Sequence, residues 1–531
     1  MAIPGSVLAA GWIPFVVVIV LILIFSSIYI KYFMTRRESE WSTTLTAISA
    51  LSITLMTTAL IPVDVFLVSF MKNSDGTFKD WAMDNATRSS IEQSVLVGYY
   101  TMYGLITFLM FLLLPFMYFF YEEREEDATC SQRCCGALKY SIVTLILVSV
   151  LLLIGALVHT KKVPEKSNST EWEKLEALFD MESNWVENSL SFIISILSLV
   201  GMLSLLTYTA YGMASLPIDL IRGSRNVKKE RLEVQNRKSE TRDKIASIRH
   251  KYSGRRNMSN RDAARISDLE ESEALMERQE RHLVARDTCC QKCLIIFRPF
   301  AIVFGILLIL LAILVFLSLL LTNIDKTMHS LGPKLGYALP KPTLPNPVDI
   351  VLVFSQQVFP LDYILFAALV VYLVLSSMAG IRKIGIWFFC LRMYKIRPHR
   401  TRPQGILMMC MILMFIQLGI NIILYELTPQ YSSYGSQHFI EHQTGNTTSV
   451  EKCSTKQGED ECMITRMSLL LTRFFYKMWF FGAAYYWCTW AFLLFILIGF
   501  LVAICKRADS SIDGEVDIDD IVDSDEELIS G

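Results

Sequence analysis

The sequence lacks the short motifs that mark many soluble enzymes and ATPases. None of G-x-x-x-x-G-K-[ST], H-E-x-x-H and G-x-S-x-G occurs in its 531 residues, so we expect no P-loop nucleotide site and none of these catalytic sites. Histidine is scarce, with 7 in the chain, and no Ser, His and Asp set is placed for hydrolysis. We therefore expect a protein that is not an enzyme, with no catalytic residues, no metal site and no tightly bound cofactor.

An excess of charge and a cleavable leader are also lacking. The 50 Lys and Arg residues nearly balance the 51 Asp and Glu residues, and this near-zero net charge hides local asymmetry, so it says nothing about partners. We expect no nucleic-acid partner. The first apolar run is too long for a signal peptide, and no small-residue cleavage site follows it. We expect this run to remain in the mature protein as a signal anchor.

What the chain has in excess is hydrophobic sequence, at 53% of residues. Nine apolar runs stand out, and a run of about 18 or more such residues can cross the ~30 Å hydrocarbon core as a helix. The predicted fold is all-α, a polytopic membrane protein with about nine transmembrane helices, whose odd number puts the two termini on opposite sides. The expected spans are residues 7–30, 45–70, 96–121, 139–158, 189–216, 300–321, 360–381, 405–427 and 478–504.

Two polar segments complete the predicted domain organisation. Spans one to five occupy 1–216 and spans six to nine occupy 300–504, with a charged loop at 217–299 between them and a disordered acidic tail at 505–531. In the loop, apolar residues recur at helical spacing, and Ser253-Gly254 interrupts them. We expect a cytosolic helical hairpin, which is either a docking surface or only a spacer.

The basic loops predict the orientation of the spans. The short loop 382–404 holds seven Lys and Arg residues and no acid, and the long loop 217–299 holds 20 basic against 13 acidic residues. Both loops lie on the same side if the chain has nine spans, and short basic loops stay cytosolic. The N-terminus is then lumenal and the C-terminus cytosolic.

Glycosylation and disulfide signals fall on the other side of the membrane. Three of the four sequons, at Asn85, Asn168 and Asn446, lie in loops assigned to the lumen, where N-glycosylation takes place. The fourth, at Asn257, lies in the basic loop and should stay unmodified. Cys453 and Cys462 also lie in a lumenal loop, as an isolated pair. In an oxidising compartment we expect these two cysteines to form a local disulfide.

The cytosolic side carries cysteine clusters and an acidic tail. Cysteines beside a membrane-entering helix are common palmitoylation sites, so palmitoylation or plain free thiols explain the clusters better than a shared zinc site. The tail ends in a pattern like the acidic dileucine sorting signals, with Ile in place of the second Leu; the alternative is an inert solubilising tail. The residues concerned are Cys134, Cys135, Cys289 and Cys290 in the clusters, and Asp525, Leu528 and Ile529 in the tail.

Asp64 and Asp362 are acids inside or at the edge of predicted spans, where a charge costs ~3 kcal/mol at the helix centre. Asp64 follows Pro62 near the lumenal end of span two, and this proline frees a backbone carbonyl that a polar solute could use. A second Pro-x-Asp places Asp362 at the start of span seven. Two interpretations stay open: a pathway for a polar solute, or hydrogen bonds that fix helix packing.

Several strings resemble the limb-region (lipocalin-receptor-like) family of membrane proteins, and the resemblance runs from span one through span nine. The strings include Phe78-Lys-Asp-Trp81, Thr207-Tyr-Thr-Ala-Tyr-Gly-Met213, Ser377-Met-Ala-Gly-Ile-Arg382 and Ile384-Gly-Ile-Trp-Phe-Phe389. The resemblance implies a nine-span lysosomal protein that lets cobalamin (vitamin B12, a corrin ring that holds cobalt) pass from the lumen to the cytosol. It implies either a transporter or an escort for an ABC-type ATPase, with a cytosolic cobalamin-processing chaperone as a further partner.

The resemblance also implies an alternative, a receptor or clathrin-adaptor-linked endocytic protein at the plasma membrane and in clathrin-coated vesicles. Membrane lipid is an expected partner, and a homodimer stays open. Soluble cobalamin enzymes often use D-x-H-x-x-G, in which the His ligates cobalt. His329 and Gly332 match that pattern, but Thr327 stands where the Asp belongs, so the pattern does not predict a cobalt ligand.

Overall fold

The computed structural model describes residues 5–35, 40–73, 75–123, 130–157, 185–223, 227–252, 259–286, 290–330, 332–333, 336–337, 339, 343–356, 358, 360–388, 391–442, 448–453, 462–476 and 479–506. The chain divides into two compact units. The first contains residues 1–215 and 311–500, and the second contains 216–310 and 501–531.

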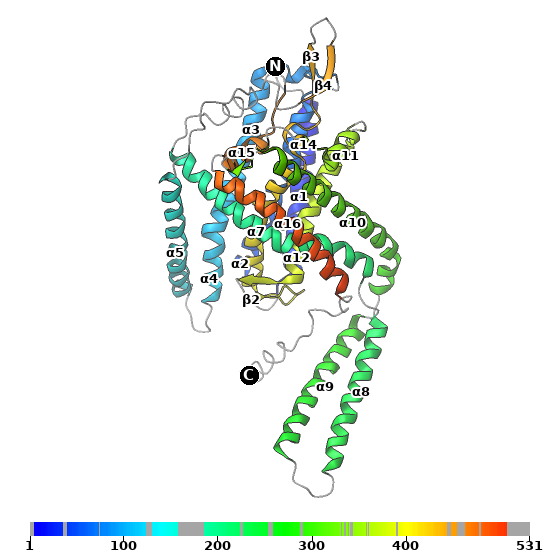
Figure 1. Ribbon diagram of the computed structural model, residues 1–531. Coiled ribbons are helices and arrows are strands. Elements are labelled where there is room, and N and C mark those ends of the chain that lie inside the picture. Colours follow the sequence, from blue (N-terminus) through cyan, green and yellow to red (C-terminus); the bar gives the residue numbers. More distant parts are fainter. Residues whose placement is uncertain are drawn as a thin grey trace. The chain divides into compact units, whose positions relative to one another are not determined.

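Helices make up nearly all of the described secondary structure (Figure 1). The longer ones are α1 (Gly5–Phe33), α2 (Trp41–Phe70), α3 (Asn85–Phe108), α5 (Cys130–Leu157), α7 (Trp185–Arg222), α8 (Val227–Lys251), α9 (Asn260–Arg286), α10 (Cys290–His329), α12 (Leu361–Ile384), α13 (Pro403–Leu427) and α16 (Trp479–Cys505). The shorter ones are the 3₁₀ turn η1 (Asp80–Ala82), α4 (Leu114–Glu122), α11 (Pro347–Ser355), α14 (Pro429–Tyr434) and α15 (Arg466–Tyr476).

Within the described residues, nine helical stretches are long and apolar enough to cross a membrane. This confirms the predicted all-α polytopic fold. The stretches are Val16–Phe33, Trp41–Phe70, Ala86–Glu122, Ser131–Gly155, Phe192–Arg222, Arg298–His329, Leu361–Ile384, Pro403–Leu427 and Phe480–Cys505. The sixth span was expected to end at residue 321, but its helix continues for two more turns to His329. Those turns contain polar residues, which is why a hydrophobicity pattern alone ended the span too early.

The third span is built from α3, α4 and a π-helical turn between them, η2 (Leu109–Leu113). Pro115 follows this turn at the start of α4. A proline has no amide hydrogen and its ring crowds the carbonyl of the preceding turn, so the helix widens locally instead of ending. The span therefore stays continuous from Ala86 to Glu122.

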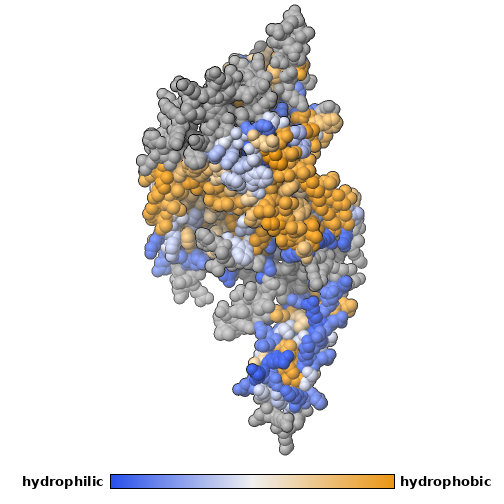
Figure 2. Space-filling model, viewed as in Figure 1, coloured by the Kyte–Doolittle hydropathy of each residue, from blue (hydrophilic) through white to orange (hydrophobic). Residues whose placement is uncertain are grey.

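Burial separates central from peripheral spans in the first unit. The most apolar stretch of α13 is 78% buried and that of α5 only 11%. Apolar side chains gather over the spanning helices on the visible face (Figure 2). In a bilayer such side chains face lipid, which is as apolar as they are, so their exposure carries no cost. α13 is thus a central helix against which α2, α4 and α12 pack.

Close helix contacts in the first unit depend on glycine. A Cβ placed on Gly212 of α7 would lie 1.8 Å from the backbone carbonyl oxygen of Ser376 in α12. A Cβ placed on Gly380 of α12 would lie 1.9 Å from the backbone carbonyl oxygen of Tyr208 in α7. The same crossing carries a hydrogen bond of 2.8 Å between the hydroxyls of Thr209 and Ser377. Small residues that allow two backbones to touch are the usual means of helix packing in lipid.

Two short β-hairpins, which the sequence analysis did not foresee, lie outside the spans. Strands β1 (Ile386–Phe388) and β2 (Leu391–Tyr394) pair antiparallel, with an irregularity after Ile386. Strands β3 (His438–His442) and β4 (Thr448–Lys452) pair antiparallel in regular register, with His438 opposite Lys452. Both hairpins satisfy the backbone groups of the loops in which they lie.

The second unit contains the helical hairpin of α8 and α9, which pack side by side (Figure 1). Val234 and Leu283 are buried between the helices. Ion pairs between the two helices add to this contact, and they join Lys238 to Glu280, Arg242 to Glu273, Arg249 to Glu270 and Lys251 to Asp262. Pairs this exposed contribute roughly 0–1 kcal/mol each, so they serve mainly to align the helices.

The glycine contacts yield a first prediction. We expect Gly212→Ala and Gly380→Ala each to lower the free energy of unfolding by about 1–3 kcal/mol or more, because the added methyl group overlaps a facing carbonyl. The measurement is the thermal unfolding midpoint of the purified protein in detergent. Gly104 of α3 is the matched control, since a Cβ there meets nothing within 4 Å. Equal midpoints for all three variants would contradict the close packing.

Candidate functional site

Asp64 lies in α2 with only 1% of its surface exposed. Its carboxylate accepts a hydrogen bond of 2.8 Å from the Met467 amide and one of 3.3 Å from the Tyr99 hydroxyl. Met467 is the second residue of α15, so the carboxylate satisfies an amide at the free N-terminus of that helix. Asp64 therefore joins α2 and α3 to the segment that follows α13.

Two further acids contact that same segment. Asp362 of α12 is 2% exposed and accepts a hydrogen bond of 3.0 Å from the Tyr431 hydroxyl. Asp349 of α11 accepts hydrogen bonds from the backbone amides of Gln430 at 3.4 Å and Tyr431 at 3.2 Å, at the start of α14. Burial raises the pKa of Asp349 to about 6, although the two amide hydrogen bonds oppose the shift.

These contacts define a group of anchoring acids: Asp64, Asp349 and Asp362. Each carboxylate accepts from a residue between 430 and 467, and none of the three is open to solvent by more than 8%. Lys72 adds a fourth connection, a hydrogen bond of 3.0 Å to the His438 carbonyl oxygen. The arrangement favours the packing interpretation of Asp64 and Asp362 over an open solute pathway.

Asp349 was not singled out in the sequence, although a local signal was available. Asn346 and Pro347 precede it, and Asn before Pro with an acid in the next turn is a helix-start pattern. The Asn346 side chain accepts from the amides of Val348 and Asp349, as that pattern implies. It also donates a 2.8 Å hydrogen bond to the Leu427 carbonyl oxygen, which ties α11 to the end of α13.

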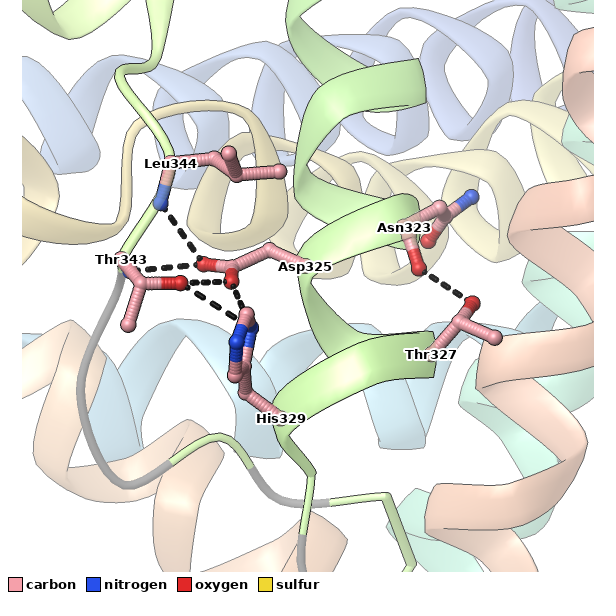
Figure 3. A network of polar contacts seen from close by, with 6 residues as sticks. All are labelled: Asn323, Asp325, Thr327, His329, Thr343 and Leu344. Atoms are coloured by element: carbon pink, nitrogen blue, oxygen red, sulfur yellow. Dashed lines mark hydrogen bonds and ion pairs between the residues drawn. The ribbon is translucent and has the colours of Figure 1, made fainter.

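A second polar network lies at the end of α10 (Figure 3). The carboxylate of Asp325 accepts from the backbone amides of Thr343 at 2.8 Å and Leu344 at 3.3 Å. It also contacts the Thr343 hydroxyl, and its Oδ1 lies 2.9 Å from Nδ1 of His329, one turn along the helix. Asp325 is 1% exposed, whereas the His329 side chain is 46% exposed.

Lys326, next to Asp325, forms a buried ion pair with Glu426 of α13. Its Nζ lies 2.8 Å from Oε1, and the two side chains are 10% and 6% exposed. The second oxygen of Glu426, Oε2, has no hydrogen-bond partner among the described residues. An ion pair this deep is costly to form and costly to break on one side only, so it fixes α10 against α13.

A chain of polar contacts runs from the bundle interior to Asp64. The Thr58 hydroxyl of α2 donates to Gln417 of α13, whose amide contacts Asn421 at 3.4 Å, and Asn421 donates to the Tyr103 hydroxyl at 2.8 Å. Tyr103 stacks on Tyr99, the partner of Asp64. Sequence reasoning missed Gln417 and Asn421 because only ionisable residues within the spans were singled out, and these two amides carry no charge.

A cavity opens beside this chain between α2, α12 and α13. Its lining is mainly apolar, with hydroxyls from Thr54, Thr58 and Ser377 and the amide of Gln417. It encloses no more than about 260 Å³, less than the roughly 300–1,000 Å³ of pockets for drug-sized ligands. It can hold water or a small solute, but not a cofactor-sized molecule.

The structure places the other predicted site residues as far as it describes them. Cys453 and Cys462 form a disulfide, buried beside Tyr434 and Phe439. Asn85 is the first residue of α3. Cys134 is partly exposed and Cys135 exposed, on the first turns of α5, and Cys290 begins α10. The remaining residues lie outside the described part of the chain, namely Asn168, Asn446, Cys289, Asp525, Leu528 and Ile529.

The fold and these sites define a class: a polytopic α-helical membrane protein whose intramembrane acids are hydrogen-bonded within the chain. Comparison with known proteins gives the family. The sequence model of the family described as LMBR1-like membrane protein matches residues 11–295. The chain belongs to this family, and the resemblance inferred from the sequence is confirmed.

Relatives match the chain over its full length. A protein of Nematostella vectensis named "Probable lysosomal cobalamin transporter" is 46% identical, with 100% of both chains covered. Proteins named "Lysosomal cobalamin transport escort protein LMBD1" are 45% identical in Danio rerio, with 100% of both chains covered, and 44% identical in Mus musculus, with 99% of both covered. No solved structure matches the chain.

The buried Asp349 yields a pH prediction. Because its pKa in the folded protein is about 6 rather than the ordinary 3.8, the folded state binds more protons than the unfolded chain between roughly pH 4 and 6. Stability therefore falls as the pH rises through this window, by up to roughly 3 kcal/mol for two pKa units. We expect the unfolding midpoint to drop between about pH 4 and 7, and Asp349→Asn to flatten this part of the profile.

The control for this prediction is Asp243→Asn, which changes an exposed acid of α8 and should leave the profile as in the wild type. Unfolding midpoints in detergent at matched ionic strength provide the measurement. A profile that keeps its full slope in Asp349→Asn would show that other groups cause the pH dependence.

Proposed function

We propose that this protein is a lysosomal membrane protein required for the export of cobalamin from the lysosomal lumen to the cytosol. The observation that carries the proposal is the match over essentially the whole chain, at 44–46% identity, to proteins named for lysosomal cobalamin transport. A family match confined to a few spans would support only the fold. Here the spans and the loops between them are all included.

We further propose that the chain acts as an escort rather than as the energised transporter. It has no P-loop, so a separate ABC-type ATPase supplies the energy of export, and a cytosolic cobalamin-processing chaperone receives the vitamin. The anchoring acids support this division, because their carboxylates are occupied by groups of the chain itself. The cavity between α2, α12 and α13 is far too small for a corrin ring with its nucleotide tail.

The proposed orientation places the N-terminus in the lumen and the C-terminus in the cytosol. Residues at the two ends of the first unit support it. Met34 pairs with Thr401, which brings the basic end of α1 and the basic loop 382–404 together. The Cys453–Cys462 disulfide follows α13 and so lies at the other end of that span. Basic residues toward the cytosol and a disulfide toward the lumen are the expected arrangement.

The direct test is export in cells that lack the protein. We expect labelled cobalamin, delivered by endocytosis, to accumulate in lysosomes of the deleted cells and its cytosolic level to fall several-fold. Re-expression of the full chain should restore delivery. Fractionation of the labelled vitamin provides the measurement, and normal cytosolic delivery in the deleted cells would exclude the proposed function.

A pair of variants separates the two interpretations of Asp64. In Asp64→Asn the side-chain oxygen can still accept from the Met467 amide, whereas in Asp64→Leu it cannot. An anchoring role predicts near-normal export for Asp64→Asn and, for Asp64→Leu, a loss of stability of about 1–3 kcal/mol with export falling in step with protein level. Loss of export in Asp64→Asn at normal protein level would instead support a solute pathway.

A further inference from the structure

His329 is the last residue of α10. It ends the sixth span, which begins at the basic residue Arg298. Its side chain is 46% exposed, and the neighbouring Met328 is 69% exposed. A half-exposed imidazole beside an exposed apolar side chain is open to a ligand from outside the chain. The question is which ring nitrogen is available and which ligand it fits.

Asp325 fixes the tautomer of His329. The buried carboxylate already accepts from the Thr343 and Leu344 amides and the Thr343 hydroxyl, and all of these groups are donors (Figure 3). An acceptor of this kind, 2.9 Å from Nδ1, requires the imidazole to carry its proton on Nδ1. In the neutral imidazole the other nitrogen, Nε2, is then unprotonated and carries a lone pair.

The ring is also held in position. Nδ1 lies 3.1 Å from the Thr343 hydroxyl as well as 2.9 Å from Asp325, so the side chain is fixed on one edge by two groups. No described residue is hydrogen-bonded to Nε2, which lies across the ring from Nδ1. A carboxylate that orients a histidine and raises its basicity is the usual outer partner of a metal-ligating imidazole.

The chemistry of the site selects the kind of metal it can bind. Among the described residues, no three His, Cys, Asp or Glu side chains stand together, so a free metal ion would lack a set of three such ligands here. A metal held in a macrocycle is different, because the ring supplies four nitrogens in one plane and leaves only axial positions. A single oriented imidazole is sufficient for such a metal.

We propose that Nε2 of His329 binds the cobalt of cobalamin as an axial ligand, with Asp325 as its positioning residue. This rests on the proposed function, which makes cobalamin the cargo. In the binding step a water molecule leaves the cobalt of aquocobalamin as the nitrogen lone pair forms the new bond. No electron is transferred, and Nδ1 keeps its proton.

The structure also explains why the D-x-H-x-x-G pattern did not identify His329 as a cobalt ligand. In D-x-H-x-x-G the acid stands two residues before the His, and here that position is Thr327. On a helix, however, residues four apart lie on the same face, so Asp325 reaches Nδ1 from one turn earlier. The acid and the histidine form the same kind of pair through a different spacing.

Absorption spectroscopy of the purified full-length protein with aquocobalamin tests the proposal. We expect the corrin absorption bands to shift on binding, since they respond to the axial ligand, and His329→Ala and His329→Gln to abolish the shift. Asp325→Asn should weaken binding about 10–100-fold, the usual effect of losing an outer carboxylate. Cyanocobalamin, whose cyanide is not displaced by imidazole, should give no shift.

His250→Ala, which removes an exposed histidine of α8, is the matched control and should bind as the wild type does. Unfolding midpoints of all variants show whether the fold is intact. An unchanged shift in a folded His329→Gln, or no shift in the wild type, would overturn the cobalt ligand. The proposed function is judged separately, because normal export in the deleted cells would remove it whatever the spectra show.

Discussion

The first unit depends on one constraint: a carboxylate inside a membrane span must find its hydrogen-bond donors within the chain, because lipid offers none. Asp64 and Asp362 meet it by accepting from residues of the segment between α13 and α16. That segment gains as well, since Met467 begins a helix whose free amides need acceptors. One set of hydrogen bonds therefore satisfies the acids of the spans and the helix ends of the loop.

The same hydrogen bonds position other features of that segment. Ser69, at the end of α2, accepts from the Ser436 amide, and Lys72 donates to the His438 carbonyl, so the β3–β4 hairpin begins from a fixed point. The disulfide between Cys453 and Cys462 then closes the loop over Tyr434. A segment that hydrogen bonds attach to α2, α11 and α12 suits a protein whose proposed task is to hold a partner.

The sequence was sufficient for the features that depend on hydrophobicity. Long apolar runs predicted nine spans, and apolar residues at helical spacing in a charged loop predicted the α8–α9 hairpin, because both patterns are local in the sequence. It was insufficient where polar residues extend a helix. The sixth span continues to His329 through Asn323 and Asp325, and these residues made the run look finished at 321. Pairings across helices, such as Lys326 with Glu426, depend on packing that no local pattern contains.

The buried acids differ in the groups that they contact, and this difference separates a structural role from a functional one. The anchoring acids accept from groups of the fold, namely the backbone amides of Gln430, Tyr431 and Met467 and the hydroxyls of Tyr99 and Tyr431. Asp325 accepts from a loop in the same way but also orients His329, which is half-exposed. A fold has no need to fix the tautomer of an exposed ring, since water would satisfy either nitrogen. The loop amides account for the burial of Asp325. The proposed cobalt ligand gives the contact between Asp325 and His329 a use, because it requires Nε2 to be free.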